Sequence, residues 1–159
     1  MEELLRILEK NARMPIEDIA AVLSKTPEEV AAMMDEAVAK GYIRGYETLV
    51  DWEKAGVNLV EAVIELRVTP HKSCGFDDIG TIIAGFDEVD TVLLMSGSYD
   101  LQVIIKGRSF QEIALFVAKR LSPLDDVIST ATSFVLRPYK RGGHLYQAEE
   151  TDEREWTIL

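Results

Sequence analysis

The fold of this chain is decided by the stretch Val92-Leu93-Leu94-Met95-Ser96-Gly97-Ser98-Tyr99-Asp100-Leu101-Gln102-Val103-Ile104-Ile105-Lys106. It reads as two short apolar strands around a turn of small residues, where Gly97 has no side chain to obstruct a tight reversal. Side chains of the second strand alternate between two faces, one with Leu101, Val103 and Ile105, the other with Gln102, Ile104 and Lys106. We predict a β-hairpin at the centre of a sheet, and its turn is the best candidate for a binding site.

A helix and then a further strand are expected on each side of this hairpin. Before it, apolar and polar residues alternate over 59–68, and helical spacing follows from about Ser73 to Ala84. After it come a second helical pattern and a last strand over 127–136. The positions of that second helix expected to face inward are Phe110, Ile113, Val117 and Leu121. The order predicts a ferredoxin-like βαββαβ domain in an α+β protein, with both helices on one face and a second subunit on the other.

The first 50 residues instead carry three short helical patterns. Thr26-Pro27-Glu28-Glu29 predicts the start of the third, with a hydroxyl N-cap, a proline at the first position and a glutamate that completes a capping box. The tight turn at Ser24-Lys25 gives the last two helices the spacing of a helix-turn-helix, with a small helical adaptor as the alternative. The inward positions of the third helix are Val30, Met34, Ala37 and Val38. Residues 42–50 are rich in strand formers and predict a hairpin or wing.

These patterns divide the chain into four segments. We expect a winged helix-turn-helix at residues 1–50, a polar linker at 51–57, the ferredoxin-like domain at 58–138 and an acidic C-terminal tail at 139–159. Within the tail, Lys140-Arg141-Gly142-Gly143 is typical of a hinge. Residues 147–155 hold five acids against one arginine, and we expect the tail over 139–159 to be extended or disordered.

Composition limits the class of protein. The chain has 159 residues, a formal net charge of −11 and one cysteine. This acidity excludes a nucleic-acid binder that is basic all over its surface. A single cysteine cannot form an internal disulfide, which favours a reducing compartment, and we find no signal peptide and no apolar run near the ~20 residues that span a bilayer. We expect a cytoplasmic protein with no membrane partner.

No catalytic or metal-binding motif stands out. His71 and His144 are far apart, and neither has a cysteine or acidic neighbour at metal-ligand spacing. A Gly-x-Ser-x-Gly elbow, a phosphate loop and a dinucleotide fingerprint are all missing from the sequence. We therefore predict no catalytic residue, no metal site and no cofactor.

Four strings, in one order over about residues 2–140, resemble the Lrp/AsnC family of feast/famine transcription regulators. They are Asn11-Ala12-Arg13 with Ile19-Ala20-Ala21-Val22, Lys40-Gly41-Tyr42-Ile43-Arg44-Gly45-Tyr46, Gly97-Ser98-Tyr99-Asp100-Leu101, and Thr130-Ala131-Thr132 with Val135-Leu136. The resemblance implies a homodimer built through the sheet domains, commonly assembled further into tetramers or octamers.

The resemblance also implies that an amino acid or related small molecule binds at subunit interfaces, near the turn and the last strand. The matching positions are Gly97, Tyr99, Asp100, Thr130 and Thr132. A carboxylate can pair with an α-ammonium group, while backbone N–H groups and hydroxyls can receive an α-carboxylate. The alternative is that Asp100 caps its own turn and that the threonines are ordinary strand residues.

The predicted recognition helix departs from the family. Between Thr26 and Ala39 it has four acids and no lysine or arginine, although affinity for DNA comes mainly from cations that displace counterions. A glutamate carboxylate can accept a hydrogen bond from cytosine. Alternatively, Glu28 and Glu29 serve only to stabilise the helix N-terminus. Predicted DNA contacts are Arg13, Lys25, Thr26, Glu28, Ala32 and Arg44, with Arg6 and Lys10 as further phosphate contacts or plain surface residues. We expect weak binding that relies on multivalency.

We predict a transcription regulator rather than an enzyme, in which an effector at the subunit interface changes the spacing of paired DNA-reading domains. One alternative is a member that has lost DNA binding and acts as an effector-responsive partner of another regulator. A siroheme-decarboxylase-like enzyme shares the two-domain plan, but the paired arginines and histidine of that class are absent from this sequence.

Overall fold

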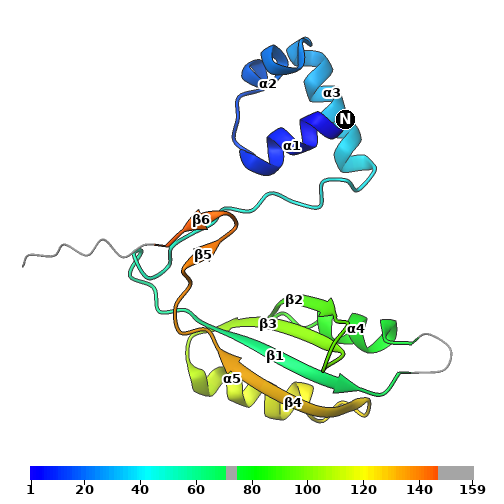
Figure 1. Cartoon of the computed structure of the whole chain (residues 1–159), viewed down its shortest axis with the longest axis vertical. Coiled ribbons are helices and arrows are strands. Elements are labelled where there is room, and N and C mark those ends of the chain that lie inside the picture. Colours follow the sequence, from blue (N-terminus) through cyan, green and yellow to red (C-terminus); the bar gives the residue numbers. More distant parts are fainter. Residues whose placement is uncertain (71–74, 147–159) are drawn as a thin grey trace, which may run out of the picture. The chain divides into compact units, whose positions relative to one another are not determined.

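The computed structural model describes residues 1–70 and 75–146 (Figure 1). The chain divides into two compact units, the first spanning Met1–Val50 and the second beginning at Asp51. Among the described residues, no helix is long and apolar enough to cross a membrane. The predicted helix start at Ser73 and the predicted extended chain over 147–159 lie outside the described residues.

The first unit consists of three helices around a small apolar core. They are α1 (Glu2–Lys10), α2 (Ile16–Leu23) and α3 (Pro27–Ala39). All three helices contribute apolar side chains to one cluster, and its buried members are Leu4, Leu8, Ile19, Ala20 and Val30. This confirms the three helices expected from the periodicity.

The start of α3 is closed as its sequence predicts, and its end is closed by a glycine cap. The Glu29 backbone N–H donates to the Thr26 hydroxyl at 3.2 Å, and the Thr26 N–H donates to the Glu29 carboxylate at 2.9 Å, which completes the capping box. At the other end Gly41 has φ +69°, and the N–H of Tyr42 donates to the carbonyl of Ala37 at 2.9 Å in a Schellman motif.

Two details of the first unit differ from the sequence prediction. Val38 is 53% exposed, because Ala37 takes the core position and its neighbour points about 100° around the helix. The expected hairpin over residues 42–50 is not formed, since residues 43–50 belong to no strand or helix. A two-stranded hairpin is marginal without a further strand or helix to pack against, so a strand-forming composition is not sufficient here.

The second unit contains a four-stranded antiparallel sheet. Its strands are β1 (Val60–Val68), β2 (Val89–Leu94), β3 (Leu101–Gly107) and β4 (Val127–Phe134), in the spatial order β2-β3-β1-β4. β2 and β3 form the predicted hairpin, closed by a hydrogen bond from the Met95 N–H to the Asp100 carbonyl at 2.8 Å. β1 lies between β3 and β4 and pairs with both along its length.

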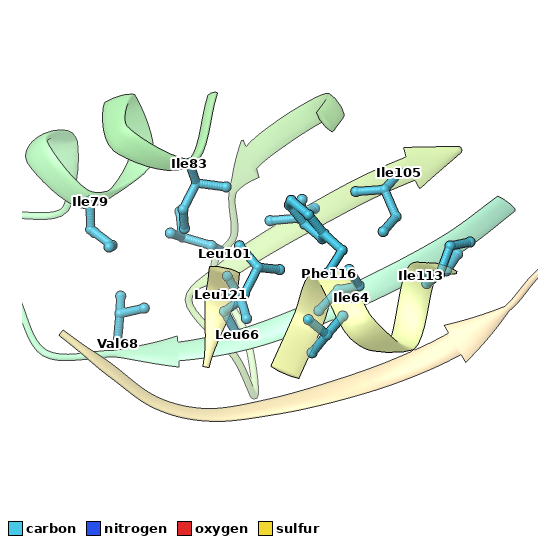
Figure 2. Close-up of a cluster of buried hydrophobic side chains, with 13 residues drawn as sticks. Ile64, Leu66, Val68, Ile79, Ile83, Leu101, Ile105, Ile113, Phe116 and Leu121 are labelled. Atoms are coloured by element: carbon cyan, nitrogen blue, oxygen red, sulfur yellow. The ribbon is translucent and has the colours of Figure 1, made fainter. Parts of the chain in front are cut away.

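Two helices cover one face of this sheet, as the crossover rule predicts. α4 (Asp77–Ala84) and α5 (Phe110–Phe116), which continues as the π-helical turn η1 (Val117–Leu121), contribute to one apolar cluster with the strands. Figure 2 shows Ile79 and Ile83 of α4 and Phe116 of α5 directed toward the strand side chains. The strand members of the cluster are Ala62, Ile64, Leu66, Val68, Leu101, Val103 and Ile105. This is the ferredoxin-like βαββαβ arrangement.

One apolar residue assigned to this core lies elsewhere, and the last strand is shorter than predicted. Phe110 is 56% exposed because it is the first residue of α5, directly after the Ser109 N-cap. Its ring packs edge-to-face on Phe134, with ring centroids 4.8 Å apart. The inward aromatic position is taken by Phe116 instead. β4 ends at Phe134, so Leu136 lies beyond the strand and is 91% exposed.

The predicted hinge at 140–143 forms a small hairpin instead. β5 (Lys140–Arg141) pairs with β6 (His144–Leu145), and Gly142 and Gly143 have φ values of +53° and +83°. Two positive φ angles suit a tight hairpin turn that follows the twist of its strands. Arg141 anchors the hairpin to β1 through two hydrogen bonds to the Glu61 carboxylate, at 2.8 and 2.7 Å.

The two adjacent isoleucines of α4 test this packing directly. Ile83 is fully buried and Ile82 is 50% exposed. We expect Ile83→Ala to lower the free energy of unfolding of the second unit by about 2–5 kcal/mol and Ile82→Ala by about 0.5 kcal/mol or less. Urea unfolding followed by circular dichroism measures both. Equal losses in the two variants would contradict the proposed orientation of α4.

Candidate functional site

The first unit presents a helix-turn-helix formed by α2, the turn at residues 24–26, and α3. Ser24 has φ +53°, a left-handed conformation that reverses the chain, and the N–H of Lys25 donates to the carbonyl of Ala20 at 2.9 Å. The side chains on the outer face of α3 follow helical spacing and are all exposed: Glu28, Ala32, Asp35 and Ala39. This face has the shape of a groove-reading helix but carries no cation.

Local contacts hold most of the acids on α3. The Glu28 backbone N–H and the Thr26 hydroxyl lower the pKa of the Glu28 carboxyl. Glu29 accepts from the Thr26 N–H, and a hydrogen bond from Lys40 lowers the pKa of Glu36, with the two side chains 2.6 Å apart. Among the described residues, only Asp35 of the four has no hydrogen bond or ion pair. The acids at the start of α3 therefore stabilise the helix N-terminus.

Cations lie around this face rather than on it. Lys10, Arg13 and Arg44 are exposed and have no ion-pair partner within the described part of the chain, while Lys25 lies 3.8 Å from Glu29. Arg44 lines a surface groove of about 520 Å³ between α1 and residues 42–47. Of the six predicted DNA contacts, four are neighbours on the turn and α3: Lys25, Thr26, Glu28 and Ala32. Arg13 lies in the connection between α1 and α2, and Arg44 lies beside α1.

The turn of the central hairpin is fixed to β1 by three consecutive residues. The N–H of Asp100 donates to the carbonyl of Leu66 at 2.9 Å. Next along β1, Arg67 Nε donates to the carbonyl of Ser98 at 3.0 Å, and the N–H of Val68 donates to Asp100 Oδ2 at 2.9 Å. One oxygen of the Asp100 carboxylate is thus used to hold its own turn, the alternative that the sequence left open.

The five predicted effector residues form two groups that β1 separates. Gly97, Tyr99 and Asp100 lie in the turn on the β3 side of β1, whereas Thr130 and Thr132 lie in β4 on its other side, opposite Leu66 and Ile64. Two strand spacings, about 10 Å, therefore separate the groups within one chain. Directly paired residues share a face, so both threonines point to the helix-covered side of the sheet.

The turn itself is open. A methyl group added to Gly97 would meet no atom within 4 Å, so no neighbour in residues 1–70 and 75–146 requires glycine there. The Tyr99 hydroxyl accepts a hydrogen bond from Gln102 Nε2 at 3.1 Å. Gln102 belongs to the sheet face without helices, so the Tyr99 hydroxyl reaches toward that open face.

Three further polar residues, which belong to no motif of the sequence, lie on the open face beside the turn: Glu65, Arg67 and Gln102. The alternation of Glu65 and Arg67 with buried leucine and isoleucine was visible as a solvated strand face. Only the register of β1 against β3 brings Glu65 opposite Gln102 and Arg67 next to Ser98. No spacing in the sequence carries that register.

The far end of the open face is occupied by paired charges. Lys106 Nζ donates to the Asp90 carboxylate at 2.5 Å, which lowers the pKa of Asp90. The bidentate contact with Glu61 raises the pKa of Arg141. These pairs tie β2 to β3 and the β5–β6 hairpin to β1, which is a structural task. Across residues 1–70 and 75–146, no cluster of His, Cys, Asp and Glu is placed to hold a metal ion.

Comparison with protein families gives two matches along the chain. Residues 2–44 match the model of a winged helix-turn-helix DNA-binding domain. Residues 61–145 match the model of the Lrp/AsnC ligand-binding domain. Each match coincides with one of the compact units described above.

Relatives of known sequence match this chain over most of its length. The uncharacterized HTH-type transcriptional regulator YugG of Bacillus subtilis is 40% identical over 153 residues, covering 96% of this chain and 92% of that protein. The HTH-type transcriptional regulator LrpA of Pyrococcus horikoshii is 25% identical over 86% of this chain and 94% of its own length.

Solved structures share the fold at lower identity. AsnC of Escherichia coli has a TM-score of 0.66 at 21% identity, covering 87% of this chain and 91% of that one. A Neisseria meningitidis transcriptional regulator solved with L-methionine has a TM-score of 0.69 at 20% identity, with 87% and 89% coverage. A feast or famine regulatory protein of Mycobacterium tuberculosis, also solved with L-methionine, has a TM-score of 0.69 at 17% identity, with 88% and 92% coverage.

The bond from Val68 to Asp100 can be tested by substitution. We expect Asp100→Ala to lower the free energy of unfolding by about 1–3 kcal/mol, because the Val68 N–H then has no acceptor. Asp100→Asn keeps an oxygen acceptor at the same place and should retain most of that stability. Amide hydrogen exchange at Val68 reads the bond itself, and unchanged protection in Asp100→Ala would rule out the contact.

Proposed function

This chain belongs to the Lrp/AsnC family of DNA-binding transcriptional regulators, and we propose that it regulates transcription in response to an amino acid bound beside the central turn. The family assignment makes it a regulator rather than an enzyme. The observation that carries the effector proposal is the triple attachment of the turn to β1, which holds polar groups in fixed positions on an otherwise open surface. We propose that it acts in the cytoplasm.

The proposed effector is an amino acid because two proteins of the same fold were solved with L-methionine. Gly97, Tyr99 and Asp100 are proposed to contact it from one subunit. Since β1 separates them from Thr130 and Thr132 by about 10 Å, and both threonines point away from the open sheet face, we propose that these threonines contact it from a subunit of a neighbouring dimer. A site shared between subunits requires a homodimer or a larger homo-oligomer.

The face proposed for self-association is the sheet face without helices. Its central side chains Val63 and Ile104 are only half-buried, and Leu93 at its edge is 45% exposed. Burial of such a face removes apolar surface from water, which drives association. An effector at the seam changes how subunits pack, and the change in packing alters the spacing of the DNA-reading units.

The proposed DNA contacts follow the layout of the first unit. Arg13, Lys25 and Arg44 would hold phosphates, while Thr26, Glu28 and Ala32 face the groove from α3. A glutamate carboxylate can accept from the cytosine amino group, and an alanine methyl can contact the thymine methyl. The first unit has six lysines and arginines against ten acids, so binding by one copy is weak and oligomeric multivalency supplies the affinity.

A second candidate function is favoured by the same charge count. If the acidic face of α3 repels DNA completely, the protein acts as an effector-responsive partner of another regulator. Undetectable binding to the promoter of its own gene at low salt, with an intact oligomer, would support this reading over the first.

A salt titration tests the phosphate contacts. The slope of log affinity against log salt concentration is negative, and its magnitude should decrease by about 0.9 for each phosphate contact removed. We expect this decrease in Arg13→Gln and in Arg44→Gln, measured by fluorescence anisotropy on a labelled promoter fragment. Arg108→Gln, an exposed arginine of the second unit, is the matched control and should keep the wild-type slope.

Light scattering with a panel of L-amino acids tests the coupling of effector and assembly. We expect at least one amino acid, with L-methionine tried first, to change the weight-average mass or to shift promoter affinity about 5- to 150-fold, the usual range of allosteric coupling. A lone monomer that ignores every amino acid in the panel would contradict the proposal.

A further inference from the structure

We propose that Arg67 and Glu65, on the open face of β1, bind the α-carboxylate and the α-ammonium group of the effector. This inference rests on the proposed function, which places an amino acid beside the turn without assigning its two charges to side chains. Neither residue belongs to the turn or to β4. Both come from the strand that lies between the two groups of predicted effector residues.

Arg67 presents a donor pair in a fixed direction. Its Nε donates to the Ser98 carbonyl at 3.0 Å, and within residues 1–70 and 75–146 its two terminal amino groups have no hydrogen-bond or ion-pair partner. Because a guanidinium is planar, the bond through Nε also orients the two terminal amino groups. Two parallel N–H donors of this kind match the two oxygens of a carboxylate.

Glu65 supplies the opposite charge nearby. It lies two residues before Arg67 on the same face, about 7 Å along the strand. Its side chain is half-buried and, in the described part of the chain, has no hydrogen bond or ion pair. A half-buried carboxylate without a partner is costly. An α-amino acid carries an anion and a cation on adjacent carbons, so one molecule satisfies both side chains.

The surroundings limit the class of amino acid. Glu65 is flanked by Gln102 on β3 and Ala131 on β4, and Gln102 is itself opposite Leu93 on β2. Ala131 is small and leaves room above β4, while Leu93 offers an apolar contact. The other charged side chains of this face are already paired: Glu61 with Arg141 and Lys106 with Asp90. An effector with an uncharged side chain therefore fits best.

Arg67 also connects the effector to the turn. A carboxylate bound at the terminal amino groups is one side chain away from the Ser98 carbonyl. Asp100, whose carboxylate accepts from the Val68 N–H, holds the turn in place rather than supplying the main ammonium contact. Since the open face is the one proposed to pack on a second subunit, the bound molecule lies at the seam and its affinity depends on assembly.

Calorimetry on the full chain tests the two assignments separately. The probes are the L-amino acid that wild type binds best, its deaminated acid and its decarboxylated amine. Arg67→Gln should lower the affinity for the amino acid about ten- to hundredfold, as expected for loss of a charged hydrogen bond. The variant should then bind the amino acid no more tightly than the decarboxylated amine. Glu65→Gln should bind the amino acid no more tightly than the deaminated acid. Arg67→Lys keeps the charge without the paired donors and should retain part of the affinity. Arg108→Gln should match wild type.

The outcomes separate this inference from the proposed function. If wild type binds an amino acid and both Arg67→Gln and Glu65→Gln bind it equally well, the two anchors are wrong while the effector proposal stands. If no amino acid binds wild type, the effector proposal fails and the anchors fail with it. Light scattering can show that the Arg67→Gln oligomer dissociates into smaller species. If the variant also loses affinity for all three probes equally, the arginine joins subunits, which overturns the assignment.

Discussion

The second unit of this protein depends on one strand with two different faces. β1 pairs with β3 on one side and β4 on the other, so it lies inside the sheet between the two strands of the second half of the βαββαβ order. Its apolar residues Ala62, Ile64 and Leu66 are completely buried under the helices. A one-residue slip of its register would send these side chains to the open face. The same register therefore fixes both the core and the polar groups opposite it.

That register also builds the candidate effector site. The main chain of β1 at Leu66 and Val68 and the side chain of Arg67 hold the turn after β2. A loop of small residues would otherwise be free to move, because it buries little apolar surface. Attachment to a central strand makes it a rigid support, which a binding site needs if a small ligand is to be recognised by the positions of its charges. The rigidity of the candidate site comes from β1, which holds the turn.

The first unit shows how an acidic chain can retain the shape of a DNA-reading module. The acids at the start of α3 are used by its N-terminus, where the helix dipole and the Thr26 cap favour negative charge. The cations of this unit without an ion-pair partner among the described residues lie outside α3, at Lys10, Arg13 and Arg44. Phosphate binding is thus assigned to cations around α3, and only a few side chains of α3 itself remain to face the bases. An oligomer that presents several such units compensates for the weak contact of each.

Local patterns in the sequence determined the helices, the four strands of the sheet and their order, since alternation, capping residues and glycine at turns act over a few neighbours. They also determined the family, because its strings occur in the same order. Tertiary structure decided what depends on distant partners: Phe116 rather than Phe110 in the core, a hairpin at 140–145 anchored by Glu61, and no hairpin at 42–50. It also decided that Asp100 is bonded to Val68 and that Arg67 lies at the turn. The physical reason is that the register between strands is set by burial of a whole face, and no short stretch of sequence contains that information.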